Sequence, residues 1–125
     1  YEKKYGKIPT ESFVAMRSDW GKRWPDQESF QNCDRKGNPH YPGWSYEAVK
    51  FLVEERKVGS IGHETFDTDP PAKEEQNHFQ IEILANLDKV PEKGGIIFCM
   101  FAKQKGGTGF PVRCFAICPQ EEEVI

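Results

Sequence analysis

Short apolar runs bounded by glycine, proline or charged residues are the feature that most constrains how this chain can fold. Runs of this length, rich in β-branched and aromatic side chains, are typical of buried strands. They predict strands at residues 12–17, 95–102 and 111–118, and a shorter strand at 58–64. Residues 103–109, which contain three glycines, separate the last two runs and predict a hairpin loop.

A helix is predicted at residues 46–57, between the first two strands along the chain. Ser45 is suited to the N-cap position, Glu47 is favourable in the first turn, and Arg56 is favourable near the end. Apolar residues recur at helical spacing, and Gly59 is predicted to close the helix. They are Ala48, Val49, Leu52 and Val53.

The remaining segments predict less regular structure. Residues 1–5, followed by Gly6, have the pattern of the last turn of a helix. A second helix is predicted at about residues 72–84, and a turn at 86–91. Residues 18–38 predict one long loop, a kind of segment that usually carries function or is disordered.

Composition limits the classes of function. The 125 residues fit a single globular domain, and their 37% apolar and 13% aromatic content argues against disorder. No apolar run approaches the ~18 residues that a membrane span needs. A net charge of −3 argues against binding to a nucleic-acid backbone as the main function.

The four cysteines, Cys33, Cys99, Cys114 and Cys118, match no disulfide framework or common zinc motif. Cys114 and Cys118 lie on the same face of one predicted strand, too far apart to bridge each other. We therefore expect small buried hydrophobic side chains in a reducing compartment, the cytoplasm.

Candidate metal-binding or acid–base residues gather in the middle of the chain. The full set is His40, His63, Glu64, Asp67, Asp69, His78 and Glu82. The segment 63–69 offers four potential ligands for a divalent cation, although a turn with backbone-capping carboxylates explains the same residues. His78 and Glu82 would share a helix face, as in some zinc hydrolases or in an ordinary surface pair.

Two other groups of residues also allow two interpretations each. The loop at 103–109 predicts a phosphate-binding nest or, more simply, a flexible hairpin loop. Basic side chains in and after the loop could attract an anionic substrate group towards it; they are Lys103, Lys105 and Arg113. Four aromatic residues could form a pocket wall or pack in a core; they are Trp20, Trp24, Tyr41 and Trp44.

Five segments together carry a family resemblance. They are FVAMRSDW at 13–20 with 22–24, YPGWS at 41–45, SIGHET at 60–65, EILANLDKVP at 82–91 and GGTGFPVR at 106–113. In order and spacing they resemble the cyclase-like metal-dependent hydrolases, the family of bacterial kynurenine formamidase and isatin hydrolase. The resemblance covers nearly the whole chain.

The resemblance implies an α/β fold, the swivelling β/β/α architecture with mixed sheets flanked by helices. It implies that residues 1–125 are a single domain, the C-terminal portion of a hydrolase domain about twice as long. The family motif His-x-Gly-Thr-His-x-Asp-x-Pro-x-His, which supplies most ligands for zinc or manganese, would lie in the other half. Glu82 occupies the position of a family metal ligand, whereas the position of a family histidine falls at Pro70 in a shortened stretch.

The function implied by the resemblance is metal-dependent hydrolysis of an amide or lactam bond in a small molecule. The favoured case is arylformamidase-like deformylation of the N-formylkynurenine type, a step of the kynurenine pathway, by a cytoplasmic homo-oligomer. No nucleic-acid or membrane partner is expected, and no catalytic residue is assigned. The alternative is a non-catalytic binding or scaffold domain that keeps the fold without the metal motif.

Overall fold

The structure, a computed structural model, describes residues 1–66, 78–107 and 109–119. The chain divides into two compact units, Tyr1–Asp88 and Lys89–Ile125, and we describe each by itself. Within the described residues, no helix combines the length and the apolar character that a membrane crossing requires.

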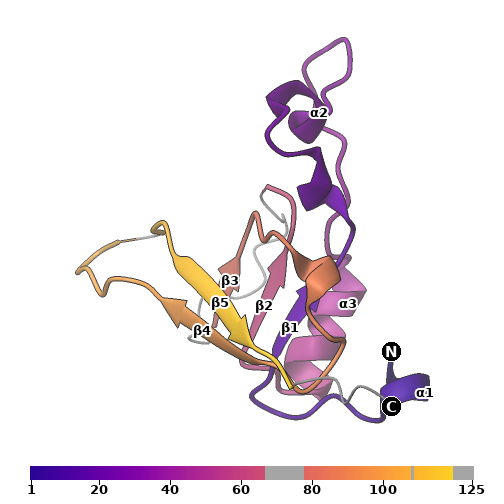
Figure 1. Cartoon of the computed structure of the whole chain (residues 1–125), viewed down its shortest axis with the longest axis vertical. Helices are drawn as coiled ribbons and strands as arrows, with labels where there is room; N and C mark the ends of the chain where they lie inside the picture. Colours follow the sequence, from indigo (N-terminus) through magenta and orange to yellow (C-terminus); the bar gives the residue numbers. More distant parts are fainter. Residues whose placement is uncertain (67–77, 108, 120–125) are drawn as a thin grey trace, which may run out of the picture. The chain divides into compact units, whose positions relative to one another are not determined.

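A three-stranded parallel sheet forms the centre of the first unit (Figure 1). Its strands are β1 (Phe13–Met16), β2 (Ser60–His63) and β3 (Phe79–Ile81), in the order β1-β2-β3. The predicted strands at 12–17 and 58–64 are thereby confirmed. Because all three strands run in the same direction, their carboxyl ends meet at one edge of the sheet.

The strand β3 replaces part of a predicted helix. The prediction of a helix at 72–84 is wrong for residues 78–84, and residues 72–77 lie outside the described part. Tertiary pairing explains the difference, because β3 completes a ladder with β2 and buries Ile81 and Leu84. Ile83 has a φ of 54°, which no right-handed helix can accommodate.

The predicted helix at 46–57 is confirmed as α3 (Tyr46–Lys50), which continues in a π-helical turn, η2 (Phe51–Glu55). The hydroxyl of Ser45 accepts a hydrogen bond from the N–H of Ala48 at 3.2 Å, as expected of an N-cap. Val49 and Leu52 are buried on its inner side. The left-handed residue after the helix is Lys57, with a φ of 55°, rather than Gly59.

Short helices occupy the N-terminal part of this unit. The predicted helical turn before Gly6 is confirmed as α1 (Glu2–Tyr5). The prediction of one long loop at 18–38 is wrong in part, because it contains η1 (Trp20–Arg23) and α2 (Gln27–Gln31).

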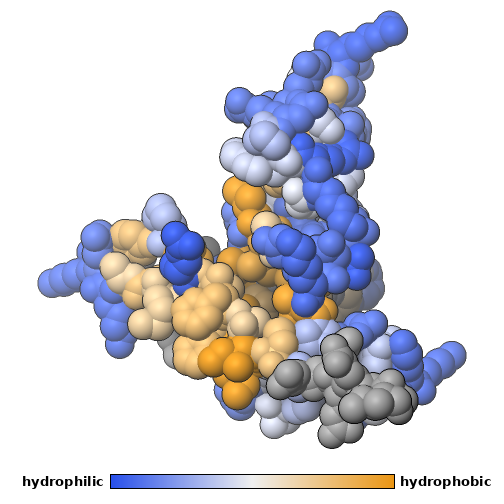
Figure 2. All heavy atoms as spheres, viewed as in Figure 1, coloured by the Kyte–Doolittle hydropathy of each residue, from blue (hydrophilic) through white to orange (hydrophobic). Residues whose placement is uncertain are grey.

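The second unit is built on an antiparallel hairpin of β4 (Ile96–Met100) and β5 (Arg113–Ile117), which confirms the predicted pair of strands. A short helical turn, η4 (Leu87–Lys89), lies where the two units join along the chain. The rings of Phe98 and Phe115 stack across one face of the hairpin, with centroids 5.0 Å apart. Figure 2 shows that apolar residues gather on the visible face of this hairpin.

The expectation that the cysteines are buried is wrong for two of them. Cys33 and Cys118 are exposed, whereas Cys99 and Cys114 are half-buried in the hairpin. All four are free thiols, and Cys99 lies directly opposite Cys114. The sequence pattern placed cysteines on two strands without showing which residues face each other.

Candidate functional site

The carboxyl edge of the parallel sheet brings together residues from three distant segments. Ser18 follows β1, Glu64 follows β2 and Glu82 follows β3. In open parallel sheets, ligands bind at the carboxyl ends of the strands, where loops from neighbouring strands converge. This edge is therefore the candidate site.

Glu64 holds the loop that follows β1. Its side chain is 2% exposed, and its Oε2 accepts hydrogen bonds from the backbone N–H groups of Ser18 at 2.6 Å and Trp20 at 3.2 Å. The hydroxyl of Ser18 donates a third bond at 2.9 Å to the same oxygen. Three donors converging on one oxygen compensate for much of the cost of burying a carboxylate.

Gly21 allows this loop to approach the edge closely. A Cβ at this position would lie 3.3 Å from the carbonyl oxygen of Leu84 and 3.5 Å from Oε1 of Glu64. The segment after β3 is in turn fixed to the end of β2, because the N–H of Leu84 donates to the carbonyl of His63 at 2.9 Å. The three segments thus form one packed edge.

His63 and Thr65 form a buried polar chain at this edge. Both are 0% exposed, and the hydroxyl of Thr65 donates to the carbonyl of Pro42 at 2.9 Å. Since that hydroxyl uses its hydrogen on Pro42, it accepts a bond from Nδ1 of His63, 3.1 Å away. The network therefore assigns the hydrogen of the His63 ring to Nδ1.

Glu82 lies exposed just after β3. The amide of Gln80 donates to Oε1 of Glu82 at 3.0 Å, as expected for residues two apart on one strand face. An exposed carboxylate at the carboxyl edge suits a metal-ligand role, and one bond from a neighbouring amide would orient it. The assignment of Glu82 as a ligand stays a prediction.

His78 does not join Glu82. Its Nδ1 donates to the carbonyl of Gly59 at 2.7 Å, at the start of β2 and so at the opposite end of the sheet. Four residues along extended chain span about 13 Å, too far for two ligands of one ion. The predicted helical pairing of these two residues is therefore wrong.

The other candidate ligands lie elsewhere. His40 contacts Asp34 in an exposed turn, with Nε2 3.3 Å from Oδ2. Asp67, Asp69 and Pro70 are outside the described residues. Within the part of the chain that the structure describes, no three His, Cys, Asp or Glu side chains cluster as a metal site. Glu82 would therefore need ligands from outside the described residues.

The four aromatic residues do not form a core of their own, because Trp24 is 64% exposed and Trp20, Tyr41 and Trp44 are half-buried. The buried ring beside them is that of Phe30. Phe30 is 1% exposed and makes edge-to-face contacts with Trp24 and Phe66, at centroid distances of 6.0 and 5.0 Å. Tyr41 contacts Phe66 in turn, at 6.1 Å. The indole N–H of Trp20 donates to the carbonyl of Phe30 at 2.9 Å, so both polar and apolar contacts anchor η1 to α2.

Among the described residues, Trp44 alone has a buried side-chain nitrogen without a hydrogen-bond partner. Its indole nitrogen can only donate, so a carbonyl or another acceptor could still bind there.

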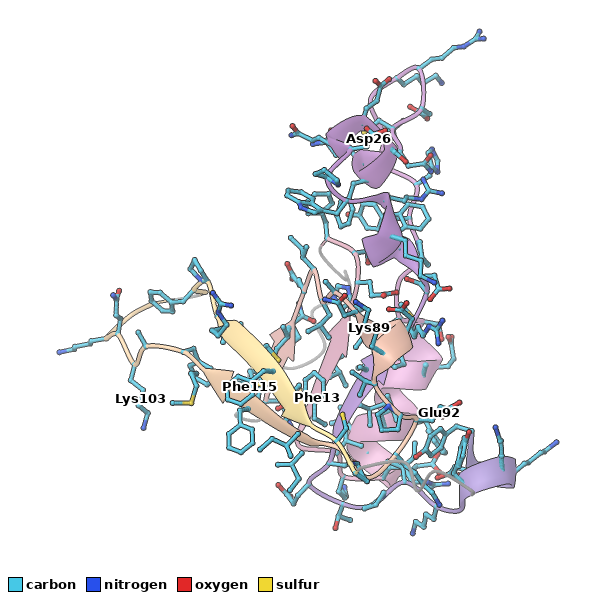
Figure 3. The ribbon with its side chains drawn as sticks, viewed as in Figure 1. Phe13, Asp26, Lys89, Glu92, Lys103 and Phe115 are labelled. Carbon is cyan, nitrogen blue, oxygen red and sulfur yellow. The ribbon has the colours of Figure 1, made fainter. Side chains whose placement is uncertain are left out.

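The basic residues belong to the second unit. Figure 3 shows the side chain of Lys103 extending from the loop that joins β4 to β5. In this loop Gly106 has a φ of 73°, and the N–H of Gly107 donates to the carbonyl of Gln104 at 3.4 Å. These features occur in hairpin turns and in anion-binding nests alike, so both interpretations stay open.

Ser18 is the site residue that sequence reasoning missed, and Glu64 was placed among metal ligands rather than loop anchors. The predicted strands at 12–17 and 58–64 would have indicated that Ser18 and Glu64 lie together if the two strands had been known to be parallel neighbours, because residues just after such strands converge. Only the parallel pairing of β1 with β2 reveals which ends converge, and it brings Ser18 to Glu64, 46 positions away in sequence.

Comparisons with known proteins show the family of the chain. Residues 1–70 match the model of the Cyclase family, described as "Putative cyclase". Isatin hydrolase from Roseibium aggregatum is 36% identical over 133 residues, which cover 96% of this chain and 50% of that protein.

Solved structures show the same fold. Isatin hydrolase A from Labrenzia aggregata, bound to benzyl benzoate, matches 95% of this chain with a TM-score of 0.84 and 35% identity. Isatin hydrolase A from Ralstonia solanacearum matches 94% with the same TM-score and 34% identity. An isatin hydrolase bound to the product analogue thioisatinate matches with a TM-score of 0.83. In each case the chain spans about half the length of the relative.

Proposed function

The chain belongs to the Cyclase family, and on that basis we propose that its protein is a metal-dependent hydrolase acting on an amide or lactam bond. The swivelling α/β fold expected from the sequence is the fold of the isatin hydrolases. The observation that carries the proposal is the carboxyl edge, where Glu82 lies exposed after β3 and Glu64, after β2, fixes the loop that follows β1.

The substrate class we propose is a small aryl lactam or aryl amide. Support comes from the names of the relatives, which are isatin hydrolases, one of them bound to thioisatinate. Arylformamidase-like deformylation of the N-formylkynurenine type stays a prediction from the sequence. Both reactions cleave a C–N bond next to an aromatic ring, so the same experiment distinguishes them.

In the proposed mechanism, each residue of this chain has a limited task. Glu82 would be one carboxylate ligand of a divalent cation, zinc or manganese, with Gln80 orienting its Oε1. When bound, such a cation polarises a carbonyl and makes a water more acidic. Glu64 fixes the Ser18–Trp20 loop, and the buried pair of His63 and Thr65 holds the end of β2 rigid beside the site.

The test is hydrolysis by the full-length protein of isatin, N-formylkynurenine and a matched aryl ester. We expect turnover of a lactam or amide that is lost on chelation and restored by zinc or manganese. Hydrolysis of neither nitrogen substrate, with the fold intact, would favour the non-catalytic scaffold instead.

We also propose that the protein is a homo-oligomer. Support comes from the hairpin face, where Ile96 is 62% exposed, Met100 69% and Ile117 58%. Apolar side chains that are exposed together on one strand face often mark an interaction surface.

A cytoplasmic location is a separate proposal. It is supported by the four free thiols, which are typical of reducing compartments. Localisation of a tagged full-length protein would test it.

A further inference from the structure

Two cysteines face each other across the hairpin of the second unit. Cys99 of β4 and Cys114 of β5 are directly opposed in the antiparallel register, and their sulfur atoms lie 3.9 Å apart. They lie on the opposite face of the hairpin from the stacked rings of Phe98 and Phe115, because strand side chains alternate between faces. The register, rather than chance proximity, brings the two thiols together.

The backbone already has the separation that a disulfide requires. Opposed residues of an antiparallel pair have Cα atoms about 4.5–5.5 Å apart, within the range of about 4.4–6.8 Å that disulfides span. The sulfur atoms need only approach each other by about 2 Å, which side-chain rotation can supply. No rearrangement of the strands is needed to close the bond.

Both sulfurs are also accessible to a small oxidant. Cys99 and Cys114 are half-buried rather than enclosed. Burial first, and then the neighbouring Cys114, raises the pKa of Cys99 to about 11, so Cys99 is held as a thiol at neutral pH. The raised pKa slows exchange at Cys99, because the thiolate is the reactive form, but the partial exposure of both sulfurs leaves them within reach of a small disulfide reagent.

We propose that Cys99 and Cys114 form a reversible redox site, which a small-molecule disulfide oxidises to a disulfide across the base of the β4–β5 loop. Two S–H bonds break and one S–S bond forms, through a mixed disulfide with the reagent. The two electrons and two protons pass to the reagent, whose own S–S bond breaks to give two thiols. A dithiol reductant reverses the reaction.

The other two cysteines make an internal control. Cys33 is exposed and belongs to the first unit, whereas Cys118 is exposed and four positions beyond Cys114. Extended chain places Cys118 about 13 Å along the strand from Cys114, beyond the reach of a disulfide to it. We therefore expect Cys33 and Cys118 each to form a mixed disulfide with glutathione, and neither to have a disulfide partner in its own unit.

The bond would restrain the loop between the two strands. Cys99 and Cys114 are 15 residues apart, and the pair Met100 and Arg113 is the last rung before the loop. Closing a loop of this size restricts its open conformations, so hydrogen exchange of the β4 and β5 amides should slow by roughly tenfold or more.

The experiment uses the intact protein and a variant with Cys33→Ser and Cys118→Ser, which keeps the facing pair and removes the other two cysteines of residues 1–125. Each is equilibrated in glutathione buffers of increasing oxidised fraction, quenched with an alkylating reagent and weighed by mass spectrometry. We expect the variant to lose about 2 Da and both free thiols, independently of protein concentration, with recovery in dithiothreitol. Peptide mapping of the wild-type protein after oxidation should show a disulfide crosslink between Cys99 and Cys114.

Two results would overturn the proposal. One is that glutathione is found on single cysteines, while Cys99 and Cys114 still react with the alkylating reagent after incubation in oxidising buffer. The other is a crosslink that joins different cysteines or requires two protein molecules. Cys99→Ser and Cys114→Ser should each abolish the mass loss of about 2 Da. Cys33→Ser should leave that mass loss unchanged.

Discussion

Oε2 of Glu64 lies 2.6 Å from the backbone nitrogen of Ser18, although 46 residues separate the two in sequence. This bond joins the loop after β1 to the end of β2 and makes the candidate site one packed edge. Removing the carboxylate would leave the N–H groups of Ser18 and Trp20 without their acceptor.

We expect Glu64→Ala to lower the free energy of unfolding by about 2–4 kcal/mol, because buried donors lose a charged acceptor. Glu64→Gln should cost about 1 kcal/mol, since an amide oxygen still accepts but more weakly. Urea unfolding followed by tryptophan fluorescence measures both, as all three tryptophans belong to the first unit. Glu47→Gln on the exposed side of α3 is the control; an equal loss there would contradict the assignment.

Gly62→Ala tests how closely the sheet is packed. A Cβ at Gly62 would lie 2.5 Å from Cζ of Phe13, 2.7 Å from Cδ1 of Leu84 and 3.2 Å from the carbonyl oxygen of Ile81. We expect a loss of about 2–3 kcal/mol in the free energy of unfolding, because neighbours on both sides must shift. Gly109→Ala, where a Cβ would meet nothing within 4 Å, should be nearly neutral.

The ion pair of Glu2 and Arg56 predicts a pH dependence of stability. Two bonds at 2.6 and 2.9 Å join the side chains, and the N–H of Ile8 also donates to Glu2. Hydrogen bonds from Arg56, then that of Ile8, lower the pKa of Glu2 from 4.5 to about 2. Because the folded-state pKa is depressed, the stabilisation is fully present above the unfolded-state pKa, near 4.5, and is lost as the pH falls to about 2.

The measurement compares the urea midpoints of the wild type and Glu2→Gln between pH 7 and pH 2. The difference should be constant above about pH 5 and shrink towards zero at the acid end. A difference that grows on acidification would contradict the pairing. Glu47→Gln serves again as the control, since the described residues give Glu47 no ion-pair partner.

Glu82→Gln in the full-length protein should reduce metal occupancy and turnover at least tenfold, on the order expected for a lost ligand. Elemental analysis and hydrolysis rates measure the two effects. Gln80→Leu, which removes the donor to Oε1, should cause a smaller loss in the same direction. Unchanged metal content in Glu82→Gln would refute the ligand assignment without disproving hydrolase activity.

The exposed hairpin face predicts a change in assembly. Phe98→Lys places a charge among Ile96, Phe115 and Ile117, so an oligomer built on this face should dissociate. Light scattering of the full-length protein gives the mass directly. Lys103→Ser, in the loop rather than on this face, should leave the mass unchanged; dissociation in both variants would argue against a specific interface.

Local patterns were enough to predict most of the elements. The strands β1, β2, β4 and β5 and the capped helix α3 all follow from residues within one short window. Asp26 is a local helix signal that the prediction did not use. Its Oδ1 accepts a hydrogen bond from the N–H of Ser29 at 3.0 Å and so caps α2. Recognising that cap would have replaced part of the predicted loop at 18–38 with a helix.

The pairing of strands that are distant in sequence could not be predicted from local patterns. The three-residue strand β3 exists because β2 lies beside it, and its own residues fit a helical pattern equally well. A long loop between β4 and β5 leaves their register open, so the opposition of Cys99 and Cys114 could not be derived. Glu64 was recognised as chemically important, but its three donors come from a segment far away in sequence.

The parallel sheet also sets an order of events for the nascent chain. The hairpin closes over 15 residues between Cys99 and Cys114, whereas the contact of Ser18 with Glu64 closes over 46. Local contacts of this kind form in microseconds, and parallel pairing of distant strands is slower. We therefore expect the carboxyl edge to assemble after the hairpin, so that the contact between Ser18 and Glu64 would be among the last to form.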